Sequence, residues 1–302
     1  MKTRRTSYPI FEEIGDVGRL HRDPKSCGVL FQVASQFNLL EMVGPRITPE
    51  HGVTRYKYDY TQGPACAIAA GAATIYRNYL VPIDGEIGQT AKRQLNMLDD
   101  FEAALVTSMG HANKNPLRMQ NGYALPDADF IKSANKHISY LSEKERDALR
   151  ATIKIGLNWE TEVTSVKETK PHLVSQAFCA AMPVAYSECS ADEWGELARI
   201  VLEAAYENTL YAAALNNDIR AIPTVFLTSI GGGAFGNPPE WITAAMDRAF
   251  SLAKDYGLDV RLVKRSRRSR DTTQLHINTQ VAYGRTCVAH LGGPIQVATN
   301  AD

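Results

Sequence analysis

The sequence predicts an α/β fold in which a mixed, largely parallel central sheet lies between two layers of helices. Strand-like and helix-like segments alternate from residue 152 to residue 263, as in parallel strands joined by crossover helices. In addition, a strand, a glycine turn and a helix start follow one another over residues 223–242. We expect one domain over residues 1–302, with an inserted helical and loop segment at 110–150 and a basic run and tail at 264–302.

The composition is that of an ordinary globular protein. Of the 302 residues, 44% are hydrophobic and 22% charged, and 33 basic residues balance 33 acidic ones. Because the charges cancel, no overall field would attract nucleic acid or an anionic membrane. We expect no membrane partner, and a nucleic-acid binder that uses the basic run that begins at Lys264 is the least favoured of three alternatives. No apolar run is long enough to span a bilayer. The sequence sets no oligomeric state.

The five cysteines are widely spaced, odd in number and without a CxxC pair. We therefore predict reduced, mostly buried thiols and a reducing, cytoplasmic compartment, although export by a route without a signal peptide stays open. Cys66 and Cys179 lie in apolar surroundings without an adjacent histidine, which predicts core thiols rather than nucleophiles. We expect no metal site and no cofactor.

Periodicity and capping signals predict the elements in order. An apolar run at 27–34 indicates a buried strand, the alanine-rich segment after Pro64 a helix packed closely on a sheet, and an apolar stripe at 89–109 a second helix. Capping boxes open a short helix at Ser142 and a long one at Ser190. The remaining predicted strands cover 152–157, 175–186, 223–230, 258–263 and 273–283, and a further helix begins at Pro238.

The glycine turn at 231–233 is the first candidate for a ligand site. Three residues without a Cβ let the backbone approach a ligand and permit positive φ, which leaves N–H groups free to bind an anion. Asn237 is a plausible N-cap for the helix that follows, whose first turn adds orphan donors. The alternative is a tight turn whose glycines serve packing alone. The spacing matches neither the GxGxxG dinucleotide fingerprint nor the GxxxxGK[ST] phosphate loop.

Polar residues also follow the first predicted strand, where open α/β sheets bind ligands. They are Ser35, Gln36 and Asn38, and further along Thr61, Gln62 and Gly63 precede a second helix start. The polar segment between them, residues 45–60, is too long for a mere connector.

Three segments together resemble the macrodomain superfamily of ADP-ribose binders, whose relatives include poly(ADP-ribose) glycohydrolases. They are VASQFNLLEM (33–42), DYTQGPACAIAAGA (59–72) and SIGGGAFGNPPEWI (229–242). Asn38 matches the second asparagine of a motif near the distal ribose, and Phe235 the aromatic residue that packs on that ribose. Asp16 resembles the acidic residue that reads the adenine amino group, although a structural turn aspartate is an equal alternative.

The resemblance implies a hydrolase that binds ADP-ribose and cleaves the bond at C1″ of its distal ribose, with a non-catalytic ADP-ribose reader as the alternative. Cleavage through an oxocarbenium-like state needs a carboxyl group, for which Asp59 is the first candidate and Glu50 the second. For both, a solvated or capping role is the competing interpretation. The expected binding residues are Asp16, Ser35, Gln36, Asn38, Thr61, Gln62, Gly63, Ser229, Gly231, Gly232, Gly233, Ala234, Phe235, Gly236 and Asn237.

Overall fold

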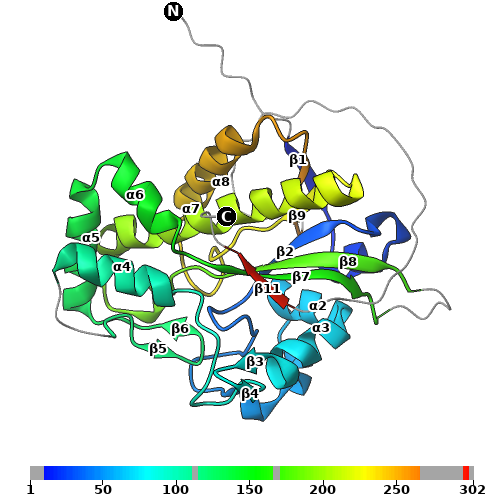
Figure 1. Ribbon diagram of the computed structural model, residues 1–302, viewed down its shortest axis with the longest axis horizontal. Helices are drawn as coiled ribbons and strands as arrows, with labels where there is room; N and C mark the ends of the chain where they lie inside the picture. The colour runs from blue at the N-terminus through cyan, green and yellow to red at the C-terminus, as the bar shows by residue number, and fades with distance from the viewer. Residues whose placement is uncertain (1–9, 111–114, 166–170, 266–294, 299–302) are drawn as a thin grey trace, which may run out of the picture.

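The computed structural model describes residues 10–110, 115–165, 171–265 and 295–298. A seven-stranded sheet forms the centre, with the strand order β1-β10-β9-β2-β8-β7-β11 (Figure 1). The first five strands in this order run parallel, whereas β7 and β11 are antiparallel to their neighbours. The predicted α/β class with a mixed, largely parallel sheet is therefore confirmed. The strands are β1 (Ile10–Ile14), β2 (Leu30–Ala34), β7 (Ile155–Glu162), β8 (Leu173–Cys179), β9 (Thr224–Leu227), β10 (Asp259–Lys264) and β11 (Ile295–Ala298).

Helices cover both faces of this sheet (Figure 1). Those on one face are α7 (Ala191–Arg220) and α8 (Pro239–Ala253), and those on the other are α1 (Val17–Arg22), α2 (Gln62–Ala69) and α3 (Gly71–Ile75), which continues into a π-helical turn, η4 (Tyr76–Leu80). Neighbouring residues of β2 show why: Leu30 joins the α7–α8 core, whereas Phe31 packs into the core on the α1–α2 side.

The segment between α3 and β7 adds three helices, α4 (Asp99–Met109), α5 (Ala128–Tyr140) and α6 (Glu143–Arg150). Two short hairpins accompany them, β3–β4 (Pro82–Ile83 with Glu86–Ile87) and β5–β6 (Met119–Gln120 with Tyr123–Ala124). Short 3-10 turns complete the chain: η1 (Pro24–Ser26), η2 (Pro49–His51), η3 (Val53–Tyr58) and η5 (Val184–Tyr186).

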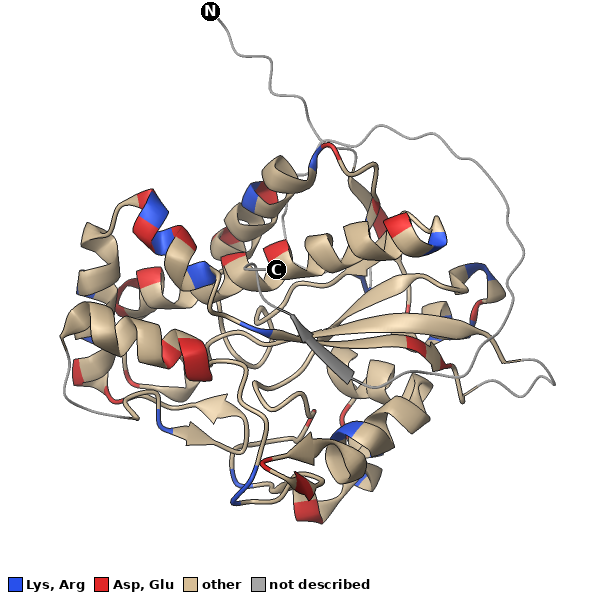
Figure 2. Ribbon diagram, in the orientation of Figure 1, with Lys and Arg blue, Asp and Glu red and all other residues tan. Residues whose placement is uncertain are grey.

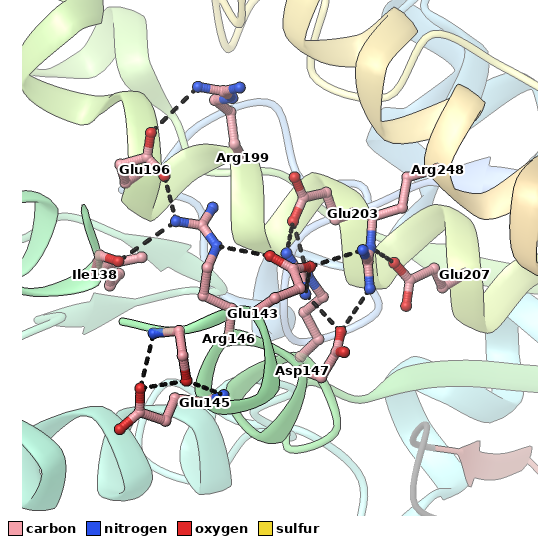
Figure 3. Close-up of polar contacts among 12 residues, drawn as sticks. Ile138, Glu143, Glu145, Arg146, Asp147, Glu196, Arg199, Glu203, Glu207 and Arg248 are labelled. Atoms are coloured by element: carbon pink, nitrogen blue, oxygen red, sulfur yellow. Dashed lines mark hydrogen bonds and ion pairs between the residues drawn. The ribbon is translucent and has the colours of Figure 1, made fainter. Parts of the chain in front are cut away.

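An ion-pair network fastens α6 to the α7–α8 layer (Figure 3). Arg248 of α8 reaches Glu143 of α6 at 2.8 Å, and the 2%-exposed Arg150 of α6 reaches Glu203 of α7 at 2.7 Å. Figure 2 shows both signs of charge on these helices, while the central strands are largely free of charge. The network orients the inserted helices against the sheet layer.

The two capping boxes predicted from sequence are confirmed, since the Ser142 and Ser190 side chains accept from the backbone three residues on. Three predictions are wrong in part. The helix expected over 89–109 begins at Asp99, because 89–98 is a loop held by the Gln89 side chain. The strand expected over 175–186 ends at Cys179, and the N-cap of α8 is Pro238, not Asn237. The strand predicted at 273–283 lies outside the described residues.

The prediction of reduced thiols is correct for two core cysteines and wrong for Cys27. Cys66 and Cys179 are free and 0% and 2% exposed, and burial raises the pKa of both thiols, that of Cys179 to about 12. Cys27, by contrast, is disulfide-bonded, which contradicts the expectation of five reduced thiols. In the part of the chain that is described, no helix is long and apolar enough to cross a membrane.

Candidate functional site

Five parallel strands end at the same edge of the sheet, and the loops that leave this edge carry the predicted site. Residues 35–38 follow β2, residues 229–237 follow β9, and the loop 180–188 follows β8. In the sheet, β2 lies between β9 and β8. Asp16 follows β1 and caps α1 by accepting the Arg19 N–H at 2.9 Å. The fold therefore gathers these residues at the carboxyl edge, where open α/β sheets bind ligands.

Strands β2 and β9 separate at this edge, and the start of α2 fills the split. Their pairing stops at Phe31, after which Gln62 takes the place of a strand partner. Its Oε1 accepts the Ala34 N–H at 2.9 Å and its Nε2 donates to Gln32 O at 2.9 Å. Gly63 follows, where a Cβ would lie 1.9 Å from Ala34 O, so no other residue fits. Gln62 and Gly63 thus dock α2 on the sheet.

The glycine turn depends on two of its glycines for its shape. Gly231 has φ +75°, and a Cβ there would lie 2.6 Å from the Cβ of Ala181; Gly236 has φ +69°, with Ala185 Cβ at 2.8 Å. A Cβ on Gly233, in contrast, meets nothing within 4 Å. Packing and backbone conformation account for Gly231 and Gly236. They do not account for Gly233.

The middle of this turn holds unused hydrogen-bond donors. Three N–H groups, those of Gly232, Gly236 and Asn237, close the turn internally. The N–H groups of residues 233–235 donate to no other residue in the described part of the chain. Gly232, Gly233 and Ala234 are exposed. A row of unpaired N–H groups in a largely exposed turn, a few residues before a 15-residue helix, is suited to an anion.

Asn237 is buried and braces the turn rather than capping α8. Its Nδ2 donates to Met182 O at 2.8 Å, in the loop after β8, and to Gly231 O at 3.3 Å. The side chain therefore ties the glycine turn to the neighbouring loop. This contact between loops that are 55 residues apart is not visible in the local sequence, where an asparagine before Pro-Pro indicates a cap.

An aromatic cluster stands beside the turn, and we define it as Tyr123, Tyr186 and Phe235. Their ring centroids are 5.5 to 5.8 Å apart. Tyr123 comes from the β5–β6 hairpin and donates its hydroxyl hydrogen to Met42 O at 2.8 Å. Sequence reasoning identified Phe235 but missed both tyrosines. The Asn-Gly pair before Tyr123 signals a hairpin, yet no local signal places that hairpin against the turn.

The first catalytic candidate, Asp59, acts electrostatically on the aromatic cluster. Burial, then Tyr186 and then the charge of Asp59 raise the pKa of Tyr123. Asp59 is half-buried, and its Oδ1 accepts the Thr61 N–H at 2.8 Å. The charge of Asp59 therefore acts on Tyr123, whose ring lies 5.5 Å from that of Phe235 in the glycine turn.

Glu50 is held elsewhere by its own contacts. It is exposed, and its Oε1 accepts the Ala91 N–H at 2.8 Å. Slight burial raises the pKa of Glu50, but the hydrogen bonds from Ala91 and Thr48 outweigh it and the net shift is downward. No contact within the described ranges links Glu50 to the turn or to Asp59.

Ser35, Gln36 and Asn38 are buried, and their side chains serve the loop that follows β2. The Asn38 Nδ2 donates to Gln94 Oε1 at 2.8 Å, and its Oδ1 accepts the Leu40 N–H at 3.1 Å. Both ends of the amide are therefore in use. Thr61, which precedes α2, is exposed, and Ser229 is half-buried.

A buried ion pair supports this loop and was not predicted from sequence. Arg77 Nη2 lies 2.9 Å from Glu41 Oε1, and the two side chains are 0% and 1% exposed. The Arg77 Nε donates to Leu39 O, and its guanidinium stacks on Phe178 at 3.8 Å. Burial raises the pKa of Glu41 to about 7, because desolvation outweighs the attraction of Arg77.

A second buried group titrates in the opposite sense. His21 is 0% exposed, its Nδ1 bonds to Val17 O at 2.8 Å, and its Nε2 faces Gln176 Nε2 at 3.1 Å. Burial therefore lowers the pKa of His21 to about 4 and keeps the ring neutral. The neutral ring stabilises the fold above its unfolded pKa of 6.5, and this contribution is lost as the pH falls towards 4.

These two groups predict opposite pH profiles. The protonated Glu41 stabilises the fold below pH 4.5, and this contribution is lost as the pH rises towards 7. The wild type loses this contribution and Glu41→Gln does not, so the unfolding free energy of Glu41→Gln should rise by about 3 kcal/mol relative to wild type between pH 4.5 and 7. The wild type gains the His21 contribution and His21→Phe does not, so the unfolding free energy of His21→Phe should fall by about 3 kcal/mol relative to wild type between pH 4 and 6.5. Urea unfolding at five pH values measures both, and parallel profiles for the three proteins would contradict this account.

In comparisons with known proteins, no protein-family model and no curated protein matches the chain. The function is therefore inferred from the residues described above. Among the described residues, no three His, Cys, Asp or Glu side chains gather as a metal site would require. The basic run that begins at Lys264 lies mostly outside the described residues.

Proposed function

We propose that this chain binds ADP-ribose at the carboxyl edge of its sheet and hydrolyses the bond at the distal-ribose C1″. One observation carries the proposal: three unpaired N–H groups at residues 233–235 lie beside an aromatic cluster whose Tyr123 experiences the charge of Asp59. The resemblance of three segments to macrodomains supports the same ligand. The described structure provides the α/β frame that such a site needs.

The diphosphate would bind to the backbone of the glycine turn. Its charge would be met by the N–H groups of residues 233–235 and by the N-terminal end of α8. No lysine or arginine occurs in residues 229–242, so backbone dipoles would supply the attraction. Phe235, half-buried, would pack against the adjoining ribose.

Asp59 would act on the water that attacks C1″. One of its oxygens accepts the Thr61 N–H, which fixes the orientation of the carboxylate, and the other has no hydrogen-bond partner among the described residues. A fixed carboxylate can accept a proton from the attacking water and stabilise the positive charge that develops on the sugar. Because Glu50 is tied to Ala91, it is the weaker candidate.

Gly233→Val tests the binding part of this proposal. Valine fits without a clash, because open space surrounds the position and its φ is not positive. We expect the melting temperature to change little, while the Kd for ADP-ribose rises about 10-fold or more, since the branched side chain covers the donors. Titration calorimetry measures the affinity. The matched control is Ala103→Val on exposed α4, and equal affinities for the two variants would overturn the assignment.

A non-catalytic reader of ADP-ribose is the second candidate. The observation that favours it is the position of Glu50, which leaves one carboxylate near the aromatic cluster where hydrolysis of most glycosidic bonds uses two. Calorimetric binding of ADP-ribose without its release from any modified peptide would establish the reader. Release of ADP-ribose by the wild type would exclude it.

A further inference from the structure

A cavity of about 260 Å³ adjoins the aromatic cluster. It lies between the β6–α5 connection and the segment that leads into α7. Residues that line it include Leu125, Pro126, Pro183, Tyr186, Glu188 and Cys189. Trp194 also lines it, and its indole N–H donates to Ser187 Oγ at 2.7 Å, so the ring offers an apolar surface without an unpaired donor.

Tyr186 belongs both to this cavity and to the aromatic cluster. Its ring is 5.6 Å from that of Tyr123 and 5.8 Å from that of Phe235. If the distal ribose packs on Phe235, as proposed, a group attached to its C1″ can extend past Tyr186 into the cavity.

The charge around the cavity is negative. Glu188 is exposed at the lining and makes no hydrogen bond or ion pair with a described residue. Asp129 and Glu193 also act on this part of the chain, and a neighbouring cation, Lys132, is already paired with Glu193 at 3.2 Å. The pKa of the Cys189 thiol is raised, first by burial and then by the negative charges of Glu193, Glu188 and Asp129, while Lys132 lowers it. The thiol therefore lies in a negative electrostatic environment.

We infer that this cavity is the acceptor subsite, and that it takes the guanidinium of an ADP-ribosylated arginine. The inference rests on the proposed function. A planar cation can stack on the ring of Tyr186, a residue that is 41% exposed, and can pair with the Glu188 carboxylate, which has no partner among the described residues. The apolar walls suit the aliphatic stem. An acidic acceptor side chain, which is released as a carboxylate, would be repelled by the same groups.

An arginine acceptor also agrees with a single catalytic carboxylate. The linked guanidinium already carries its proton, so the C1″–N bond breaks with its electron pair passing to nitrogen and a neutral guanidine leaving. Water forms the new C1″–O bond and gives one proton to Asp59, which passes it to the guanidine. The products are ADP-ribose and an arginine guanidinium, and no second acid is needed.

Two modified peptides test the inference. They share one sequence that contains both an arginine and a glutamate, and ADP-ribose is attached to the arginine in one and to the glutamate in the other. We expect the wild type to release ADP-ribose faster from the arginine-linked peptide. Glu188→Gln should raise KM for that peptide about 10-fold and leave KM for the glutamate-linked peptide unchanged. The matched control is Asp192→Asn, an exposed carboxylate at the start of α7 that does not line the cavity.

The outcomes separate the two proposals. Release from the glutamate-linked peptide alone overturns the arginine subsite and leaves the proposed hydrolase intact. Equal effects of Glu188→Gln and Asp192→Asn on KM overturn the subsite as well, because they reduce it to general surface charge. Failure to release ADP-ribose from either peptide, with no binding of free ADP-ribose, overturns the proposed function and with it this inference.

Discussion

Replacing Arg77 by methionine is expected to lower the free energy of unfolding by about 3–5 kcal/mol at pH 8. Arg77 is 0% exposed and pairs with an equally buried Glu41. Without the guanidinium, which lowers the pKa of Glu41, that pKa would rise further, so the variant must either bury an unpaired carboxylate or protonate it, and both cost stability at pH 8. Methionine retains most of the contact with Phe178, so the loss reports the charge rather than packing.

Urea unfolding measures this change, and an exposed pair provides the control. Arg118 lies 2.6 Å from Asp127, with side chains 58% and 41% exposed, so Arg118→Met should cost less than about 1 kcal/mol. The double variant Arg77→Met/Glu41→Leu should recover part of the loss, because it removes the unpaired charge. A cost for Arg77→Met no larger than that for Arg118→Met would refute the role of the pair.

Asp59→Asn is expected to reduce the rate of ADP-ribose release by about 10²–10⁴-fold while KM changes little. Asparagine keeps the shape and an oxygen that accepts the Thr61 N–H, so the loop before α2 should stay in place. What it loses is the ability to take a proton from water. Release of ADP-ribose from modified peptides, followed by chromatography, measures the rate.

Glu50→Gln serves as the matched control for Asp59→Asn. Glu50 is exposed and hydrogen-bonded to Ala91, and its replacement should leave the rate within about 3-fold of wild type. A larger loss for Glu50→Gln than for Asp59→Asn would reverse the assignment of the two carboxylates. Full activity in both variants would remove them both from the mechanism.

Elements with a strong local signal were predictable from the sequence. The long helix α7 begins where Ser190 and Glu193 form a capping box, and β2 is a short apolar run bounded by turn formers. The segment 89–98 was wrongly predicted to be part of the following helix, because Leu95 and Leu98 continue the apolar spacing of α4. Both residues belong to a loop that packs on the core. Periodicity reports burial and cannot distinguish a buried loop from another helical turn.

The candidate site was predictable only where its residues follow one another in the chain. The glycine turn and the Gln62-Gly63 helix start could be identified because each carries its own turn chemistry. Tyr123 and the Glu41–Arg77 pair could not, since their partners lie 36 or more residues away and their roles arise from tertiary contacts. Asn38 shows the converse: a motif indicated a ligand contact, and the structure uses both ends of its amide internally.

A crystal structure with bound ADP-ribose tests the central claim most directly. The account predicts diphosphate oxygens within hydrogen-bonding distance of the N–H groups of residues 233–235, the distal ribose against Phe235, and C1″ on the side of Asp59. A diphosphate bound away from the glycine turn, or a C1″ directed away from Asp59 and Tyr123, would contradict it.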